Sequence, residues 1–397
     1  SGKLTQAVLQ RSALQAAPPS PPQAPISSSS KWLMLIALVT WLVSGSLAAP
    51  VTVLLAVAPV LYLRRRSAQP QPQSPPAGAG GLGGVLGGLF APASPQPARR
   101  RAKAAEALKE DGFALHPLDE NEDRSTWKTL EQFLRTSDPS QLGKGKDVTR
   151  AYGEYNELRL ASTWRIEHPR AKQKYDAAKE LVLEDMKLLD RRSVHSLGAQ
   201  PKGLPVATAP AAASFALTPV ASEALLLHGT SAAKLLSVLA NGLNERYSGS
   251  SAGTAFGDGV YLAEDVAKTD QYAAPDAKYD GSSDLHRRLY GDSNRHQGSV
   301  FYVLVCRALL GYPARTQQTG QGARHMETGE RLFPVSFREL ANIPNVTPPK
   351  NYHSLIAELG PAIVRYREFI LFHGEQVCPE YLLAYHRCHN GDVVTGP

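Results

Sequence analysis

The chain has few cysteines and lacks the patterns of several common protein classes. Only three of its 397 residues are Cys (Cys306, Cys378 and Cys388), which excludes a disulfide framework and favours a reducing compartment. No Gly-x-Gly-x-x-Gly follows a strand pattern, so a Rossmann-type dinucleotide site is not expected. The sequence also has no zinc-finger spacing and no contiguous basic stripe in its C-terminal part.

The formal net charge of +7 invites a nucleic-acid or acidic-membrane interpretation. Two arginine triplets, 64–66 and 99–101, supply six of the positive charges and lie outside any expected fold. The remainder is close to neutral, so a nucleic-acid partner is not predicted. Binding that depended steeply on salt would argue the other way.

Residues 1–30 are rich in Ala, Pro, Gln and Ser and are predicted to be disordered. The next segment, 31–63, is predicted to be transmembrane, because no charge interrupts the apolar run 32–63 and about 20 apolar residues span a bilayer. A single tilted or kinked span is favoured over a hairpin, whose two arms would each be short.

Two other interpretations of this run are disfavoured. Residues 46–49 resemble a signal-peptidase site, but the apolar run continues well beyond them. A buried core helix would need a folded partner, and no such segment flanks the run. Because Arg64–Arg66 directly follow the span and a single basic residue, Lys31, directly precedes it, the positive-inside tendency places the C-terminal part on the cytoplasmic side.

Downstream, a Pro/Gly-rich linker is predicted for 64–101, a helical segment of unknown role for 102–147, and a folded domain for 148–390. The helical segment holds helices at 102–110 and 125–134, the second capped by Ser125. The domain shows an α+β pattern with a mixed or antiparallel sheet. Strands are expected at 158–166, 224–227, 299–306 and 368–372, and helices at 171–191, 232–239, 264–272 and 379–383.

Three patches in the last 180 residues carry the strongest functional signal. They are the Leu-Leu-His-Gly-Thr ending at Thr230, the stretch from Phe256 to Tyr272, and the Tyr-Arg-Glu-Phe-Ile-Leu-Phe of 366–372. Together they resemble the poly(ADP-ribose) polymerase (PARP) catalytic domain, in which a His, a Tyr and a Glu surround NAD. The Arg-Ile-Glu-His-Pro passage at 165–169 is similar to the opening strand and helix of that domain in smaller members.

The resemblance implies a role for each matched residue. Glu368 would hydrogen-bond the nicotinamide-side ribose and stabilise the cation that develops there, as in glycoside hydrolysis. His228 and Thr230 would contact the adenosine ribose. The backbone of Gly229 would pair with the nicotinamide amide, because Gly permits close approach.

The remaining matched residues would surround nicotinamide. Tyr261 and Tyr272 would sandwich the ring, and Thr269 stands where the family more often has serine. Ala263 and Lys268 also match the pattern. The stretch 244–257 resembles the loop over the donor site, and Gly249, Gly253, Gly257 and Gly259 would give it mobility.

The resemblance implies an NAD+ ADP-ribosyltransferase of the His-Tyr-Glu type, with NAD+ as a substrate and no separate cofactor. It would cleave the nicotinamide–ribose bond and transfer ADP-ribose to protein acceptors, and both single and polymeric addition stay open. The alternative is a catalytically silent NAD- or ADP-ribose-binding membrane adaptor. Retained NAD binding without nicotinamide release would favour the adaptor.

No metal site is predicted. The polar insertion 273–298 contains no Cys, which argues against zinc. Cys378, His386, Cys388 and His389 lie near one another in sequence, but their spacing fits no standard metal site.

Overall fold

The computed structural model describes residues 96–144, 154–248, 254–291 and 295–394. The predicted disordered tail, the predicted membrane segment and most of the linker therefore lie outside the described residues. Within the described ranges, no helix combines the length and apolarity needed to cross a membrane. The last residues assigned to the linker are helical, because the helix predicted from residue 102 begins at Gln96.

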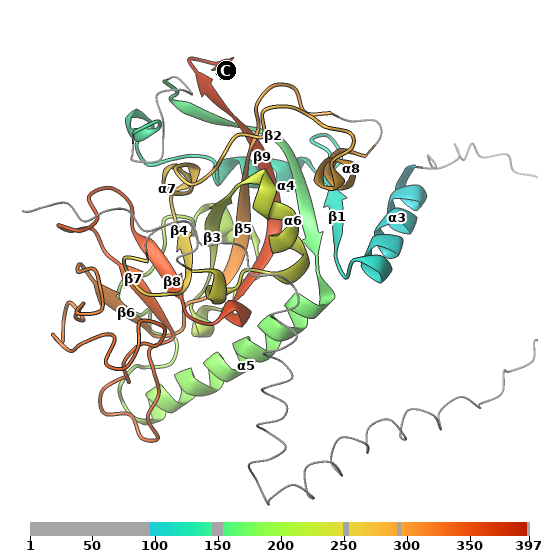
Figure 1. The fold of residues 1–397 in the computed structure, drawn as a ribbon. Helices are drawn as coiled ribbons and strands as arrows, with labels where there is room; N and C mark the ends of the chain where they lie inside the picture. The colour runs from blue at the N-terminus through green and yellow to red at the C-terminus, as the bar shows by residue number, and fades with distance from the viewer. Residues whose placement is uncertain (1–95, 145–153, 249–253, 292–294, 395–397) are drawn as a thin grey trace, which may run out of the picture. The chain divides into compact units, whose positions relative to one another are not determined.

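A single sheet of ten strands forms the centre of the described region (Figure 1). Its order is β1-β2-β9-β5-β3-β4-β8-β7-β6, with β10 paired to β9, and every pairing is antiparallel except β6 with β7. The predicted α+β class with a mixed sheet is confirmed. The strands are β1 Ala114–Pro117, β2 Glu157–Glu167, β3 Glu223–Thr230, β4 Val260–Ala263, β5 Phe301–Leu309, β6 Pro313–Thr316, β7 Ser354–Ala357, β8 Glu368–Leu371, β9 Val377–His389 and β10 Asp392–Val393.

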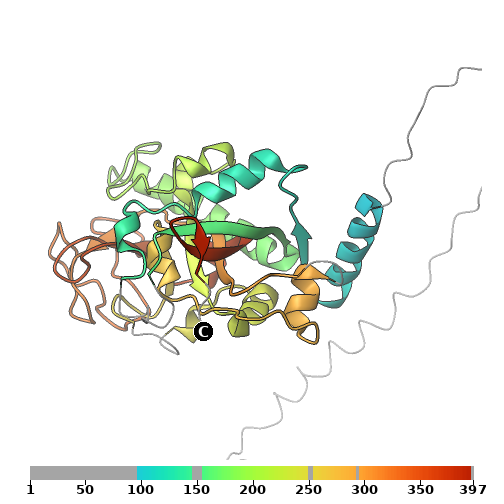
Figure 2. The same cartoon turned by 90° about the horizontal axis from the view of Figure 1, so that it is seen from above.

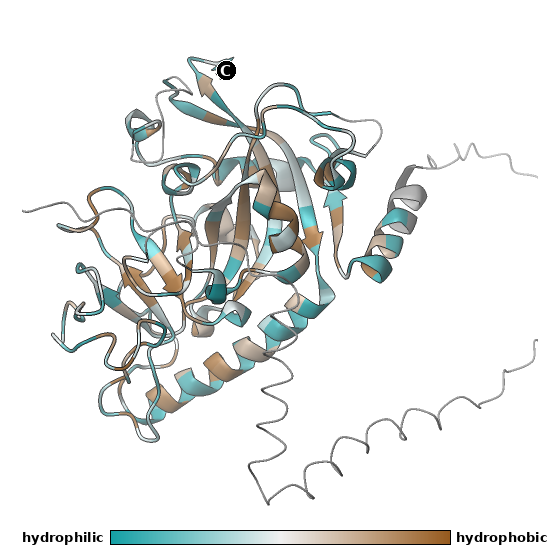
Figure 3. Ribbon diagram, in the orientation of Figure 1, coloured by the Kyte–Doolittle hydropathy of each residue, from teal (hydrophilic) through white to brown (hydrophobic). Residues whose placement is uncertain are grey.

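The longest helix, α5, begins at Pro169 and ends at Arg191. Pro169 occupies the first helical turn, where its missing N–H costs nothing. The helix runs beneath the strands in Figure 1 and shows alternating apolar and polar surface in Figure 3. The other helices are α3 Gln96–Glu110, α4 Arg124–Gln132, α6 Ala232–Asn241, α7 Val266–Asp270 and α8 Asp284–Tyr290.

The central strands are buried on both faces. Alternate residues of a strand point to opposite faces, so in β3 Leu226 joins the core under α6 and α8, whereas Leu225 and Leu227 join the core under α4 and α7. Figure 2 shows α4 and α8 on opposite sides of β2. A third apolar cluster, which includes Met186 of α5, lies against β6, β7 and β8.

Two predicted features are wrong. Residues 379–383, predicted as a helix, lie inside β9, where Leu382 and Leu383 are both fully buried between β2 and β5. Pro379 is tolerated there because the register with β5 shifts beside it. Ser125 does not cap α4, whose N-cap is Asp123.

The 102–147 segment contains a strand as well as helices. Its β1 pairs with β2 and forms one edge of the sheet. Farther on, the backbone N–H and the hydroxyl of Ser137 both donate to Asp265, at 2.9 and 2.7 Å. The other carboxylate oxygen of Asp265 caps α7 by accepting from Ala267 N–H at 2.9 Å. The segment thus supports the start of α7.

Candidate active site

The predicted site residues lie where β3, β4 and β8 run side by side. Ala263 of β4 is paired with Leu227 of β3 on one side and with Glu368 of β8 on the other. Glu368 is also opposite Ala357 of β7. These pairings place Leu227, Ala263, Glu368 and Ala357 in one row across four neighbouring strands, here called the Glu368 row. Glu368 is therefore level with the residue that precedes His228.

The imidazole of His228 is fixed by the neighbouring strand. Its Nδ1 lies 2.9 Å from the backbone carbonyl oxygen of Tyr261. A carbonyl can only accept, so Nδ1 carries the proton and donates it. Burial lowers the pKa of His228, which keeps the ring neutral at neutral pH. In this tautomer Nε2 is an acceptor, suited to a hydroxyl group.

Tyr261 is held through its hydroxyl group. The hydroxyl donates to the carbonyl of Gly257 at 2.8 Å and accepts from the N–H of Phe256 at 2.9 Å. Burial raises the pKa of Tyr261, so the hydroxyl stays protonated. These two bonds fix the ring and tie the segment before β4 to it.

Glu368 is the one buried carboxylate among the predicted site residues, with 9% of its surface exposed. Its Oε1 lies 2.9 Å from Nζ of Lys268, which projects from α7. The ammonium of Lys268 also lies 5.2 Å from the centre of the Tyr272 ring. Burial alone would lower the pKa of Lys268, but the Glu368 carboxylate outweighs it and the pKa is raised. Lys268 is therefore a cation that compensates Glu368.

Gly229 is the point at which β3 meets α7. A Cβ on this residue would lie 2.2 Å from the backbone carbonyl oxygen of Thr269. The hydroxyl of Thr269 donates to Val266 O at 2.9 Å, within its own helix. Thr230 is buried at the end of β3, opposite Tyr302 of β5. Eight of the nine predicted residues thus contact or pair with at least one other member of the set. The ninth, Thr230, follows Gly229 on β3.

The Gly229→Ala variant is expected to lose about 1–3 kcal/mol of unfolding free energy. The added methyl group meets backbone atoms of α7, which cannot rotate away as a side chain can. Urea unfolding of the full chain checks this. Gly322→Ala is the control, because its Cβ would meet nothing within 4 Å and its φ is not left-handed. Equal stability of the two variants would contradict the close contact.

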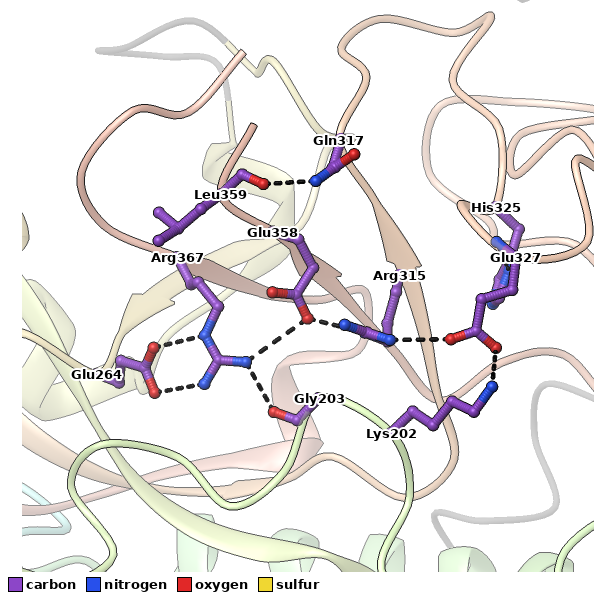
Figure 4. Close-up of polar contacts among 10 residues, drawn as sticks. All are labelled: Lys202, Gly203, Glu264, Arg315, Gln317, His325, Glu327, Glu358, Leu359 and Arg367. Atoms are coloured by element: carbon purple, nitrogen blue, oxygen red, sulfur yellow. Dashed lines mark hydrogen bonds and ion pairs between the residues drawn. The ribbon is translucent and has the colours of Figure 1, made fainter. Parts of the chain in front are cut away.

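A charged cluster lies immediately beyond the Glu368 row (Figure 4). Its members are Glu264, Arg367, Glu358, Arg315, Glu327 and Lys202. Arg367 forms a two-pronged pair with Glu264, with N–O distances of 2.6 and 2.7 Å. Its third nitrogen donates to the carbonyl of Gly203 at 2.8 Å and lies 3.5 Å from Glu358. Because strand neighbours alternate in direction, Arg367 points to the sheet face opposite Glu368. It joins the segments that continue β4 and β7 to the start of β8.

The cluster extends outward through Arg315 of β6. This residue donates to Glu358 at 2.8 Å and to Glu327 at 2.9 Å. Glu327 in turn accepts from Lys202 at 2.8 Å, a lysine whose side chain is 73% exposed. In Figure 4 the chain of pairs runs from Glu264 to Lys202.

Two glycines predicted to give the donor loop mobility have another role. A Cβ on Gly257 would lie 2.6 Å from the Phe372 ring, and its φ of +105° is one that L side chains rarely adopt. A Cβ on Gly259 would lie 2.7 Å from the carbonyl oxygen of Leu371. Both permit close packing against β8 and the residue after it. Residues 249–253 of this loop lie outside the described residues.

Sequence reasoning missed Arg367 and Glu264, although each is the immediate neighbour of a motif residue. The available signal was a charged residue next to Glu368 and another next to Ala263. Their pairing became visible only with the register of β4 against β8.

A comparison with known protein families accords with this geometry. Residues 144–387 match the poly(ADP-ribose) polymerase catalytic domain. The chain belongs to the PARP family. Membership agrees with the resemblance of the three sequence patches and accounts for the sheet on which they lie.

Among individual PARP relatives, the chain is similar to a protein of Caenorhabditis elegans named poly [ADP-ribose] polymerase tankyrase. The two are 26% identical over 180 residues, which is 41% of this chain and 7% of the nematode protein. The similarity thus covers only a small part of that relative.

Proposed function

We propose that the protein is an NAD+ ADP-ribosyltransferase that cleaves the nicotinamide–ribose bond and passes ADP-ribose to protein acceptors. The observation that carries this is the buried Glu368 carboxylate, paired with Lys268 and aligned with β4. Family membership supports ADP-ribosyl transfer in general. NAD+ acts here as the donor substrate.

Loss of nicotinamide leaves positive charge on the ribose, and a fixed carboxylate stabilises such a transition state. In this proposal Glu368 accepts hydrogen bonds from the ribose hydroxyls and faces that charge. Lys268 orients the carboxylate through their 2.9 Å pair. Glu368 is also suited to orient an acceptor hydroxyl, which leaves both single and polymeric addition open.

The other matched residues would bind the donor. Nε2 of His228 accepts from a hydroxyl of the adenosine ribose, since Nδ1–H is already committed to Tyr261. The rings of Tyr261 and Tyr272 hold nicotinamide between them, and the Gly229 backbone pairs with its amide. Thr230, Ala263 and Thr269 complete the walls.

The test is incubation of the full chain, in detergent, with NAD+ labelled on either the nicotinamide or the adenylate. Transfer to protein predicts free nicotinamide and labelled protein in equal amounts. Bound NAD+ without free nicotinamide would establish the silent adaptor instead. Nicotinamide release with only free ADP-ribose would show a hydrolase and overturn the transferase proposal.

The His228→Gln variant is expected to raise KM for NAD+ about tenfold, the loss of one hydrogen bond of ~1.4 kcal/mol. The effect on kcat should be smaller, because the adenosine ribose lies away from the broken bond. His389→Gln, an exposed histidine at the end of β9, is the matched control. An unchanged KM in His228→Gln would remove His228 from the donor site.

We further propose that residues 32–63 anchor the protein in a membrane with the catalytic domain facing the cytoplasm. The support comes from the uncharged run and from Arg64–Arg66 that follow it. This orientation would give the domain access to cytoplasmic NAD+.

A further inference from the structure

A second group of ionisable side chains lies in the 273–298 insertion. Asp276 lies in the segment after α7 and pairs through its backbone with Val300, next to β5. His286 lies on α8, and His296 lies in the loop that leads into β5. Each offers one ligand atom, and these three atoms all lie within 4.8 Å of one another.

The three side chains are removed from solvent. The exposed fractions are 2% for His296, 5% for His286 and 10% for Asp276. Both Nε2 atoms face the same oxygen, Asp276 Oδ2, at 2.7 Å from His286 and 3.6 Å from His296. Two imidazoles and a carboxylate that converge in a buried site are the donor set of many zinc sites.

His296 supplies an independent observation. Its Nδ1 lies 3.1 Å from the carbonyl of Gly298 and therefore donates to it. Its Nε2 is buried and has no hydrogen-bond partner. In the neutral ring, that Nε2 turns a lone pair toward an anionic oxygen. A cation between the two atoms would remove this unfavourable arrangement.

The surroundings match those of metal-bound histidines, which usually donate their second ring N–H to a carbonyl or carboxylate. Gly298 provides that carbonyl for His296. Nδ1 of His286 lies 3.1 Å from the Asp280 carbonyl and 2.7 Å from the Asp280 N–H. Without a metal, Nδ1 accepts from that N–H and Nε2–H donates to Asp276. Tyr302 donates to the same Asp276 oxygen at 2.9 Å.

We infer that Asp276, His286 and His296 bind a zinc ion, with water in the remaining coordination position. Ligand bonds of about 2.0–2.1 Å in a tetrahedron separate the ligand atoms by about 3.3 Å. The 3.6 Å distance between His296 Nε2 and Asp276 Oδ2 is already close to this value. The 2.7 Å distance between His286 Nε2 and the same oxygen must lengthen. Metal binding through Nε2 of His286 would move its proton to Nδ1. The 2.7 Å hydrogen bond from the Asp280 N–H would then break, and Nδ1–H would donate to the Asp280 carbonyl instead.

The site also has a place in the fold. Arg295 and Gln297, the two sequence neighbours of His296, line a cavity of about 540 Å³. Asp276 follows the nicotinamide-site candidate Tyr272 by four residues, so a bound ion would tether that segment to β5. The inference departs from the prediction of no metal, which set this insertion aside because it contains no cysteine.

The experiment uses the full chain in detergent, stripped with a chelator and titrated with Co²⁺ and then Zn²⁺. We expect one Co²⁺ per chain, visible absorption typical of four- or five-coordinate cobalt, and its loss on addition of one equivalent of Zn²⁺. Histidine ¹⁵N NMR of the same protein should show two Nε2 resonances shifted by Zn²⁺. The NMR readout requires no variant.

His296→Gln and Asp276→Asn should each weaken metal binding by at least tenfold. His373→Gln, an exposed histidine on another loop, should bind as the parent does. Failure of the parent to hold one ion per chain would overturn the site. Equal binding by His296→Gln, or unshifted histidine resonances in the parent, would assign the metal to the surface and overturn it as well.

Discussion

The Glu368→Gln variant is expected to release nicotinamide about 10²–10³-fold more slowly than the parent chain. The substitution keeps the size of the side chain and one acceptor oxygen, but it replaces the other oxygen with an NH2 donor and removes the charge that faces the developing cation. Because that charge matters mainly in the transition state, kcat and kcat/KM should fall together. Initial rates of nicotinamide release over a range of NAD+ concentrations measure both.

Two further variants separate this effect from disturbance of the site. Glu375→Gln, an exposed glutamate after β8, should react like the parent. Glu368→Gln leaves the Lys268 ammonium without its partner, so the double variant with Lys268→Met tests whether that unpaired charge matters. If the double variant recovered most of the activity, Glu368 would be a structural partner of Lys268 rather than a catalytic carboxylate.

The site was predictable to the extent that its chemistry is carried by short local patterns. His228, Tyr261 and Glu368 each stand within a strand whose apolar neighbours are evident in the sequence. The structure places them on β3, β4 and β8, which lie next to one another. The sequence alone could not establish that adjacency, because it depends on the pairing of β4 with β3 and with β8, and the second joins residues more than a hundred positions apart.

Short apolar runs were the least reliable guide. Residues 379–383 contain a helix-compatible set of side chains, and a run this short does not distinguish a helix from a strand buried on both faces. Burial between β2 and β5 decides the outcome. The short strands β6 and β7 were likewise not predicted, since four residues give little periodicity.

Long-range polar groupings left almost no sequence signal. Asp276, His286 and His296 are spaced ten residues apart, a separation that belongs to no motif, and only the path of the insertion brings them together. Arg367 and Glu264 are similar, because the strand register that pairs them is a property of the folded sheet.

The second large effect is expected from Arg367→Met, which should lower the free energy of unfolding by about 3–5 kcal/mol. The side chains of Arg367 and Glu264 are only 17% and 10% exposed. Removal of the guanidinium therefore leaves the Glu264 carboxylate largely shielded from water without a cationic partner, with only the Ala207 N–H donating to it, while Glu358 keeps Arg315. Urea unfolding of the full chain measures the loss.

The cluster offers an internal control. Lys202→Met removes its exposed end and should cost no more than about 1 kcal/mol, as surface pairs do. Adding Glu264→Gln to Arg367→Met should recover part of the stability, because an amide is less costly to bury than a charge. Equal losses in Lys202→Met and Arg367→Met would mean that burial does not set the strength of these pairs.

The same variants test whether the cluster positions Glu368. Arg367 joins the start of β8 to the ends of β4 and β7, and Glu368 is the next residue. If the cluster fixes the carboxylate, kcat should fall in Arg367→Met at temperatures where the protein remains folded, with a smaller change in KM. Arg367→Lys keeps the charge but not the two-pronged geometry, so it should recover stability more than kcat. A kcat that simply followed the folded fraction in every variant would limit the cluster to stabilising the sheet.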